Sequence, residues 1–356
     1  MQRPTRRPDN IPDSVKYLVT GAAGYIGSHT VRELLARDAT RVVAVDSLVR
    51  GHQGAIDALA GVAGGRLRFE QLDLRERAPL AALLAEERPD AVLHFAAYTL
   101  VGESVAQPAM YWSCGVGGTS SLIEAMRAAG TPRLVFSSTA ATYGAPEGMP
   151  ISEETPQRPV NPYGASKLAC EAIIRDEVAA ARRDGRAFAA TMLRYFNVAG
   201  CASDGLLGED HDPETHLVPS ALQAALGMRP ALQLFGTDYP TPDGTCIRDY
   251  VHVEDLAAAH VDALHAQQPH GCEAFNVGIG HGFSVREVFA ECERVVGKAI
   301  PVTVAARRDG DPPVLVSDPA RIMRELGWRP RHRTLAPMVE SAWNWMRTHP
   351  QGYRTR

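Results

Sequence analysis

The chain has 356 residues, of which 45% are hydrophobic and 22% are charged, and its formal net charge is −4. This composition is typical of a globular protein with one large core and room for a smaller lobe. The charge predicts no general affinity for nucleic acid or for an anionic membrane, and no apolar run is long enough to span a bilayer.

The N-terminal residues 1–14 are rich in arginine and proline and contain no apolar segment, which predicts a disordered extension rather than a secretory signal. The histidines lack the helical spacing of a zinc protease, so no metal site is predicted. The six cysteines are scattered singly, which indicates reduced thiols in a cytoplasmic protein.

A strand, a glycine turn and a helix are predicted over residues 15–35. The apolar run 15–20 leads into Gly21-Ala22-Ala23-Gly24-Tyr25-Ile26-Gly27, and a helical apolar period follows. Gly21 allows a sharp turn, Gly24 allows the backbone to approach a pyrophosphate, and Gly27 allows the helix to pack closely on the sheet. Free N–H groups at the helix start, around Tyr25 and Ile26, would face the phosphates.

The next run, 41–46, predicts a second strand that ends in Asp46, 19 positions after Gly27. A carboxylate about 20 residues after the glycines commonly binds the adenine ribose, and it would repel a 2′-phosphate, so NAD is favoured over NADP. Alternatively, the glycines are ordinary turn residues and Asp46 an ordinary loop acid, since G-x-x-G-x-x-G departs from the commoner G-x-G-x-x-G.

Strands and helices continue to alternate as far as residue 138. Residues 89–97 predict a strand whose end, Phe95-Ala96-Ala97, is small enough to pass close to a cofactor. The other expected elements are a strand over 66–74, a helix over 76–87, one helix over 101–130 and a strand over 131–138. This order predicts an α/β fold with a doubly wound, parallel Rossmann-type sheet and its ligand at the carboxyl ends of the strands.

The alternation stops after residue 196, which predicts a nucleotide-binding domain over 15–196 and a smaller C-terminal α+β substrate lobe over 197–245 and 277–350. Residues 246–276 are expected to return to the first domain, with a strand over 249–252, a helix over 253–267 and a strand over 273–276. A final packing helix is expected over 330–347.

Tyr163 and Lys167 are four residues apart at the start of a predicted helix, so they share one face. An adjacent ammonium would favour the phenolate and make Tyr163 a usable base, while Lys167 could also bind a nicotinamide ribose. Thr139, at the end of the strand over 131–138, could hold the substrate hydroxyl. Alternatively, Tyr163 and Lys167 are a common surface pair.

Several motifs together resemble the UDP-glucose 4-epimerases, a family of extended short-chain dehydrogenases/reductases, over about residues 15–347. The motifs are the glycine turn 21–27, Val101-Gly102-Glu103-Ser104-Val105, Thr139 with Tyr163 and Lys167, Arg194-Tyr195-Phe196-Asn197, and Asp243-Gly244-Thr245-Cys246-Ile247-Arg248-Asp249-Tyr250-Val251-His252-Val253.

This resemblance implies a homodimer that uses tightly held NAD to invert C4 of a UDP-hexose through a 4-keto sugar. It also implies roles for residues on both sides of the site. Asp73 and Leu74 would lie beside the adenine, and Phe196 near the cofactor. The implied substrate contacts are Asn197 on the diphosphate, His216 and Leu217 near the uridine, Phe235 beside the base, Arg248 and Arg308 on the phosphates, and Asp311 on the uridine ribose.

The resemblance also places Leu315 beside the sugar C2 substituent, where a leucine would disfavour an N-acetyl group. Two departures from the family pattern are expected to alter the cofactor side. Residues 98–100 supply no lysine, and Cys114-Gly115 replaces an Asn-Asn pair, followed by glycines that loosen a helix.

Other functions remain open from the sequence. A sugar-nucleotide 4,6-dehydratase begins with the same oxidation, but the Ala140-Ala141 pair after Thr139 cannot transfer protons. A 4-epimerase acting on a UDP-pentose, UDP-uronic acid or UDP-N-acetylhexosamine is harder to separate. A non-catalytic NAD-binding protein on the same fold is a further alternative, because a fold does not decide function.

Overall fold

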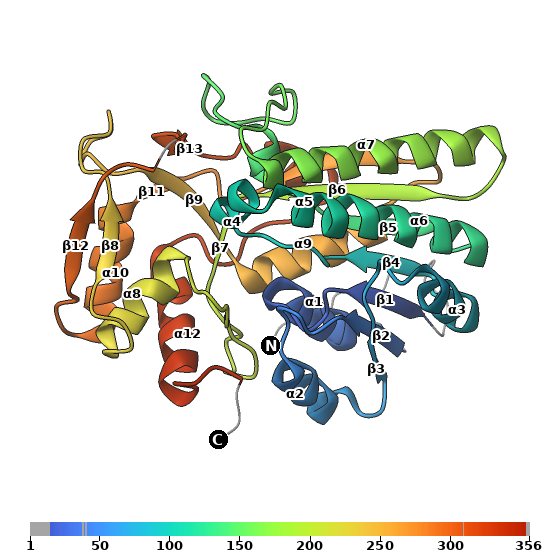
Figure 1. Ribbon diagram of the computed structural model, residues 1–356, viewed down its shortest axis with the longest axis horizontal. Coiled ribbons are helices and arrows are strands. Elements are labelled where there is room, and N and C mark those ends of the chain that lie inside the picture. The colour runs from blue at the N-terminus through green and yellow to red at the C-terminus, as the bar shows by residue number, and fades with distance from the viewer. Residues whose placement is uncertain (1–14, 38, 40, 309, 354–356) are drawn as a thin grey trace.

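The structure is a computed structural model that describes residues 15–37, 39, 41–308 and 310–353, so the predicted extension over 1–14 lies outside it. A parallel sheet of seven strands forms the larger part of the molecule (Figure 1), in the order β10-β6-β5-β4-β1-β2-β3. Its strands are β1 (Lys16–Thr20), β2 (Arg41–Asp46), β3 (Leu67–Gln71), β4 (Ala91–His94), β5 (Arg133–Ser137), β6 (Ala189–Tyr195) and β10 (Cys272–Val277).

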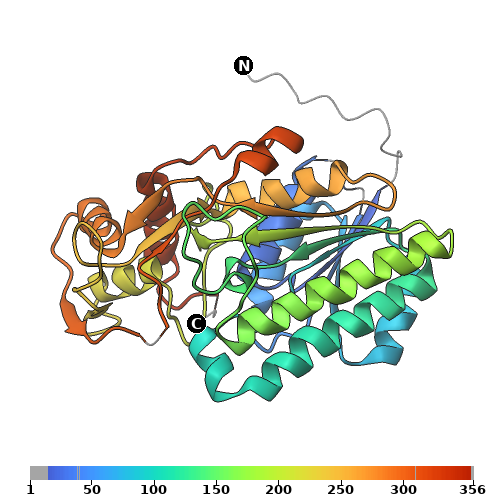
Figure 2. The same ribbon diagram turned by 90° about the horizontal axis from the view of Figure 1, so that it is seen from above.

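Helices cover both faces of this sheet, which explains why its central strands are apolar on both sides. Figure 2 shows α6 (Gly118–Ala129) and α7 (Pro162–Arg183) on one face, and α1 (Tyr25–Arg37) and α9 (Val253–His265) on the other. The outer helices α2 (Gln53–Ala63) and α3 (Arg77–Glu87) complete the two layers.

The segment predicted as one helix over 101–130 is broken, so that prediction is wrong. It forms α4 (Val101–Ala106), α5 (Pro108–Tyr111), the π-helical turn η1 (Trp112–Gly117) and then α6. Pro108 lacks an N–H and disfavours helical backbone at Gln107, where φ is −133°. Gly115 lies in the wider η1 turn, where its Cα faces Ser166 of α7.

The smaller part contains two further sheets. Strand β9 (Ile247–His252) pairs with β7 (Asn197–Ala199), β11 (Gly282–Ser284) and β13 (Val314–Leu315), while β8 (Leu232–Phe235) pairs with β12 (Val302–Ala305). A second core lies between α8 (Leu217–Ala225), α10 (Val285–Val296) and α12 (Leu335–Thr348). The short helix α11 (Ala320–Glu325) packs beside β10.

Strand β9 corrects one prediction, because the strand over 249–252 does not return to the seven-stranded sheet. Strand propensity shows that a segment is extended, but it does not name the neighbouring strand. The next two elements do join the larger part, since α9 packs on α1 and β10 pairs with β6.

Tyr353, the last described residue, holds a loop of the smaller part. Its backbone N–H donates to Asp210 Oδ2 at 2.9 Å, and its hydroxyl accepts from the Gly208 N–H at 2.8 Å. Its ring stacks on His52 of the larger part, with centroids 5.5 Å apart. Among the described residues, no helix combines the length and apolarity that a membrane span requires.

Candidate active site

A cavity of about 1310 Å³ lies where the carboxyl ends of the central strands meet loops of the smaller part. Every predicted cofactor and substrate residue lines it, apart from Lys167. The Lys167 side chain is buried and does not form part of the lining. The residues singled out in the sequence therefore gather in one place, although they come from both parts of the fold.

The glycine turn between β1 and α1 is built from close backbone contacts. Gly21 has φ +68°, and a Cβ there would lie 2.6 Å from the Ala96 backbone N. A Cβ on Gly27 would lie 2.0 Å from the Gly21 carbonyl oxygen. Gly24 meets only its own turn and lines the cavity. A bare backbone cradle at a helix start fits the pyrophosphate of a dinucleotide.

Asp46 ends β2 at the edge of this cradle. Its carboxylate accepts from the Ala23 N–H at 3.0 Å and from the Leu48 N–H at 2.9 Å. Burial raises the pKa of Asp46, and these backbone hydrogen bonds partly offset the rise. An ionised carboxylate has about four acceptor sites, so capacity remains for ribose hydroxyls. Asp73, farther along the wall, is paired with Arg75 at 2.6 Å.

Tyr163 lies in the first turn of α7, which begins at a well-formed N-cap. The Asn161 side chain accepts from the Gly164 N–H at 2.9 Å, and Pro162 occupies the first helical position. A Cβ on Gly164 would lie 2.4 Å from the Ala141 carbonyl oxygen, so glycine lets the helix approach the segment that carries Thr139. This packing role of Gly164 was not predicted from the sequence.

The electrostatics of Tyr163 differ from the prediction. Burial raises its pKa, and a hydrogen bond with Thr139 partly offsets the rise. The predicted lowering by Lys167 is wrong for this structure, because the lysine Nζ is directed elsewhere. It donates to the Ser137 carbonyl oxygen at 2.8 Å and lies over the Phe136 ring. Burial lowers the pKa of Lys167 itself to about 8.

A buried polar network supports the end of β5 behind this pair. Glu171 is fully buried, pairs with Arg194 at 2.8 Å and accepts from the Ser138 hydroxyl at 2.6 Å. Burial alone would raise the pKa of Glu171, but Arg194 and Ser138 lower it below its ordinary value. Glu171 follows Lys167 by four residues on the buried face of α7, and a charge on that face was the signal that could have revealed it.

The opposite wall of the cavity presents charged and aromatic side chains from the smaller part. Arg248 of β9 forms an ion pair with Asp311. The Arg308 guanidinium lies 4.0 Å from the centroid of the Phe235 ring, a cation–π contact. In each pair, an arginine that could donate to phosphate oxygens contacts another group of the same wall. Asp311 could accept from ribose hydroxyls, and the Phe235 ring could lie against a base.

The remaining predicted substrate residues border this wall. Asn197 begins β7, and His216 is the N-cap residue of α8, just before Leu217. Leu315 lies in β13 opposite Arg248 and packs against a small cluster that includes Ala140. The structure thus brings these side chains to the cavity, while their contacts with a substrate stay predictions.

Comparison with known proteins gives the family. The sequence profile of the NAD dependent epimerase/dehydratase family matches residues 17–278. The chain belongs to this family. Solved epimerase structures share the α/β fold seen here and hold NAD, so the predicted fold class and NAD as the cofactor are confirmed.

Individual relatives are similar over nearly the whole chain. It is 47% identical over 339 residues to a UDP-glucose 4-epimerase of Lacticaseibacillus casei, covering 95% of this chain and 98% of the relative. It is 44% identical to a probable UDP-arabinose 4-epimerase 3 of rice, over 96% of this chain and 84% of that protein. The crystal structure of the Bifidobacterium longum UDP-glucose 4-epimerase with NAD⁺ and UDP superposes with a TM-score of 0.90 at 38% identity, covering 95% of this chain and 100% of that one.

Proposed function

We propose that this protein inverts C4 of a UDP-hexose and interconverts UDP-glucose and UDP-galactose. The observation that carries the proposal is the position of the Thr139–Tyr163 pair on one cavity shared by the glycine turn and the arginine-bearing wall. The relatives named UDP-glucose 4-epimerase support the choice of sugar.

The residues that line the cavity would have separate roles in cofactor binding, proton transfer and substrate binding. The glycine turn and Asp46 would hold NAD, which supplies a hydride acceptor and donor at C4 when it is bound. Tyr163 would take the proton of the 4-hydroxyl and return it, with the cationic nicotinamide of bound NAD favouring the phenolate that burial alone disfavours, and Thr139 would orient that hydroxyl. Arg248 and Arg308 would hold the diphosphate and so fix the nucleotide end of the substrate.

The neighbours of Thr139 favour epimerisation over elimination of water. Ala140 and Ala141 follow it in a short 3₁₀ turn, η2 (Ala140–Thr142), and both line the cavity. A 4,6-dehydratase needs an acid and a base beside the sugar, and a methyl group supplies neither. A UDP-pentose 4-epimerase is the second candidate, because a rice relative is named as a probable UDP-arabinose 4-epimerase.

The test is incubation of the purified protein with UDP-galactose and, separately, with UDP-arabinose, with products resolved by chromatography. We expect UDP-galactose to give UDP-glucose with a higher kcat/KM than the pentose reaction. Tyr163→Phe should form no product, whereas Tyr239→Phe should be fully active because Tyr239 does not line the cavity. Faster turnover of UDP-arabinose would assign the pentose, and a stable 4-keto-6-deoxy product would assign a dehydratase.

We also propose a cytoplasmic homodimer. Free thiols at Cys114 and Cys272 support a reducing compartment. Exposed Val105 and Trp112, near the α4–η1 corner, are apolar side chains that a second copy could cover. Light scattering on purified protein would show a mass of twice 38.4 kDa if the dimer forms.

A further inference from the structure

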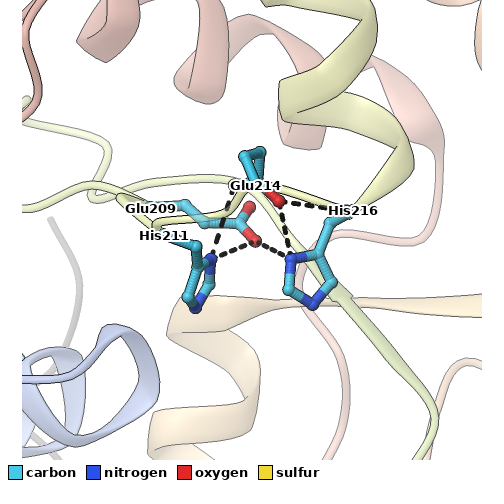
Figure 3. Close-up of side chains that lie close together, drawn as sticks. All are labelled: Glu209, His211, Glu214 and His216. Atoms are coloured by element: carbon cyan, nitrogen blue, oxygen red, sulfur yellow. Dashed lines mark hydrogen bonds and ion pairs between the residues drawn. The ribbon is translucent and has the colours of Figure 1, made fainter. Parts of the chain in front are cut away.

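Four side chains with metal-binding atoms converge on the loop between β7 and α8, and the proposed function uses only one of them. Figure 3 shows Glu209, His211, Glu214 and His216 pointing toward one another from this loop. One ligand atom from each lies within 4.8 Å of all the others. No metal site was predicted from the sequence, because the expected signal was a pair of histidines spaced along a helix, whereas these histidines lie on a loop.

Three of the four histidine–glutamate distances in the cluster match those of atoms that share a central ion. His211 Nδ1 lies 3.4 Å from Glu209 Oε1 and 3.4 Å from Glu214 Oε2. His216 Nδ1 lies 3.3 Å from Glu209 Oε1 and 2.9 Å from Glu214 Oε1. Tetrahedral zinc with bonds of ~2.0–2.2 Å places its ligand atoms ~3.3–3.6 Å apart. Only the shortest of the four contacts also qualifies as a hydrogen bond.

The burial of Glu209 is independent evidence that the cluster binds a ligand. Its side chain is 3% exposed, and among the described residues neither carboxylate oxygen has a hydrogen-bond partner. His211 Nδ1 is buried and unpartnered in the same way. A buried carboxylate without a hydrogen bond is costly, and a bound cation removes that cost. Within the described part of the chain, both groups lack hydrogen bonds, have only the ion-pair contacts dashed in Figure 3, and are directed into the same cluster.

We propose that Glu209, His211, Glu214 and His216 bind one zinc ion. Two imidazole nitrogens and two carboxylate oxygens match the ligand types and the tetrahedral number that zinc prefers. A site filled by four protein ligands is structural, so the ion holds the loop and takes no part in the reaction.

The position of the cluster shows what such an ion would hold. The His211 ring packs edge-on against Tyr25, with centroids 6.0 Å apart, at the start of α1. His216 is the N-cap residue of α8 and faces the cluster through Nδ1, which leaves Nε2 for a substrate contact. The ion would therefore fix the loop between the nucleotide turn and the uridine side of the cavity.

Protons are the competitor for this site. Zinc binds neutral imidazole and ionised carboxylate, so protons compete with it for the ligands and its affinity should increase with pH.

The test is metal analysis of tag-free protein after dialysis against metal-free buffer, followed by zinc titration of chelator-treated protein. We expect one zinc per chain, and a rise in melting temperature that saturates at one equivalent. Cobalt in its place should give the intense visible bands of four-coordinate geometry. Both measurements are independent of turnover, so they do not depend on the proposed function.

Glu209→Gln and His211→Asn should each weaken zinc binding at least tenfold, while His281→Asn, an exposed histidine elsewhere, should not. The near-ultraviolet circular dichroism of Glu209→Gln shows whether it folds. Cysteine-bound zinc would survive both loop substitutions and overturn the proposal. Failure of the wild-type protein to bind micromolar zinc at pH 8 would also overturn it.

Discussion

Backbone atoms form one wall of the cavity, and side chains form the opposite wall. The wall that would hold NAD, called here the nucleotide wall, is made of backbone atoms. Gly21, Gly27 and Ala96 meet there, and an added methyl group would overlap a neighbour. The opposite wall, called here the sugar wall because it would hold the UDP-sugar, is made of long side chains. These are already paired, Arg248 with Asp311 and Arg308 with Phe235.

This difference predicts which amino-acid substitutions each wall can tolerate. A backbone cradle is fixed by the fold, so substitution there should disturb folding and cofactor binding together. A wall of side chains can be altered one residue at a time, and substitution there should change selectivity while the fold persists. Five substitutions test this contrast.

Tyr163 lies where the walls meet, and its replacement should have the largest effect. Tyr163→Phe removes the proton acceptor but keeps the ring that fills the buried site, so kcat should fall by ~10²–10⁴-fold. Bound NAD, measured by absorbance after denaturation, should stay at the wild-type level. Activity within a few-fold of wild type would remove Tyr163 from the reaction.

Gly27→Ala should damage the nucleotide wall most. The new Cβ would lie 2.0 Å from the Gly21 carbonyl oxygen, and backbone there cannot move without opening the turn. We expect a loss of at least ~1–3 kcal/mol in the free energy of unfolding, together with loss of NAD.

Gly61→Ala is the matched control, because its Cβ meets nothing within 4 Å on the outer helix α2. It should be neutral or stabilise the protein by ~0.5–1 kcal/mol, since alanine is the better helix former. Urea unfolding measures the free energy of unfolding of both variants. Equal values would show that the glycine turn accommodates the added methyl group more easily than its contacts indicate.

Lys167 gives a pH test of the buried layer under the cavity. Its pKa falls from 10.5 to about 8 by burial, so between these values the unfolded chain holds a proton that the native protein has lost. The contribution of Lys167 to stability should therefore rise as pH increases from about 8 toward 10. The difference in unfolding free energy between wild type and Lys167→Met should change over this range.

Asp46 is the charged exception on the nucleotide wall. Asp46→Asn keeps an oxygen for the Ala23 or Leu48 N–H but removes the charge that would repel a 2′-phosphate. The ratio of NADP to NAD affinity, measured by titration, should increase about tenfold or more. Asp57→Asn, on an exposed face of α2, should leave the ratio unchanged, and an equal ratio in all three proteins would contradict the role of Asp46.

Leu315 should show the smallest effect, confined to the sugar wall. Leu315→Ser removes a side chain that lines the cavity, so the preference for UDP-galactose over UDP-N-acetylgalactosamine should narrow about tenfold. Val316→Ser is the control, because Val316 points toward Gly282 and does not line the cavity. If both variants keep the wild-type ratio of kcat/KM values, Leu315 does not control sugar size.

The nucleotide wall was largely predictable from the sequence, since its signals are local. Glycine spacing, strand alternation and the helix behind them lie within residues 15–46, and the structure places them as expected. The interruption at η1 was not predicted, because a π-helical turn depends on packing against α7 as well as on Gly115.

The sugar wall was predictable only through family resemblance. No local pattern shows that Arg248 reaches Asp311 across 63 positions, or that Glu209 is buried without a hydrogen bond. The pKa of Tyr163 was expected to be lowered, but burial raises it. The sequence shows the spacing of Tyr163 and Lys167, but it does not show that the Lys167 Nζ is directed toward the Ser137 carbonyl oxygen.

The contacts of Tyr353 have a consequence for how the protein is made. The loop that carries Gly208 and Asp210 is joined to Tyr353 across 145 and 143 positions of the chain. On the ribosome, strands β1 to β6 can pair while the rest of the chain is still being synthesised, since domains fold as they emerge from the N-terminus. The contacts of this loop with Tyr353 can form only after residue 353 has been synthesised, so the sugar-binding side of the enzyme becomes complete after the larger sheet has been able to form.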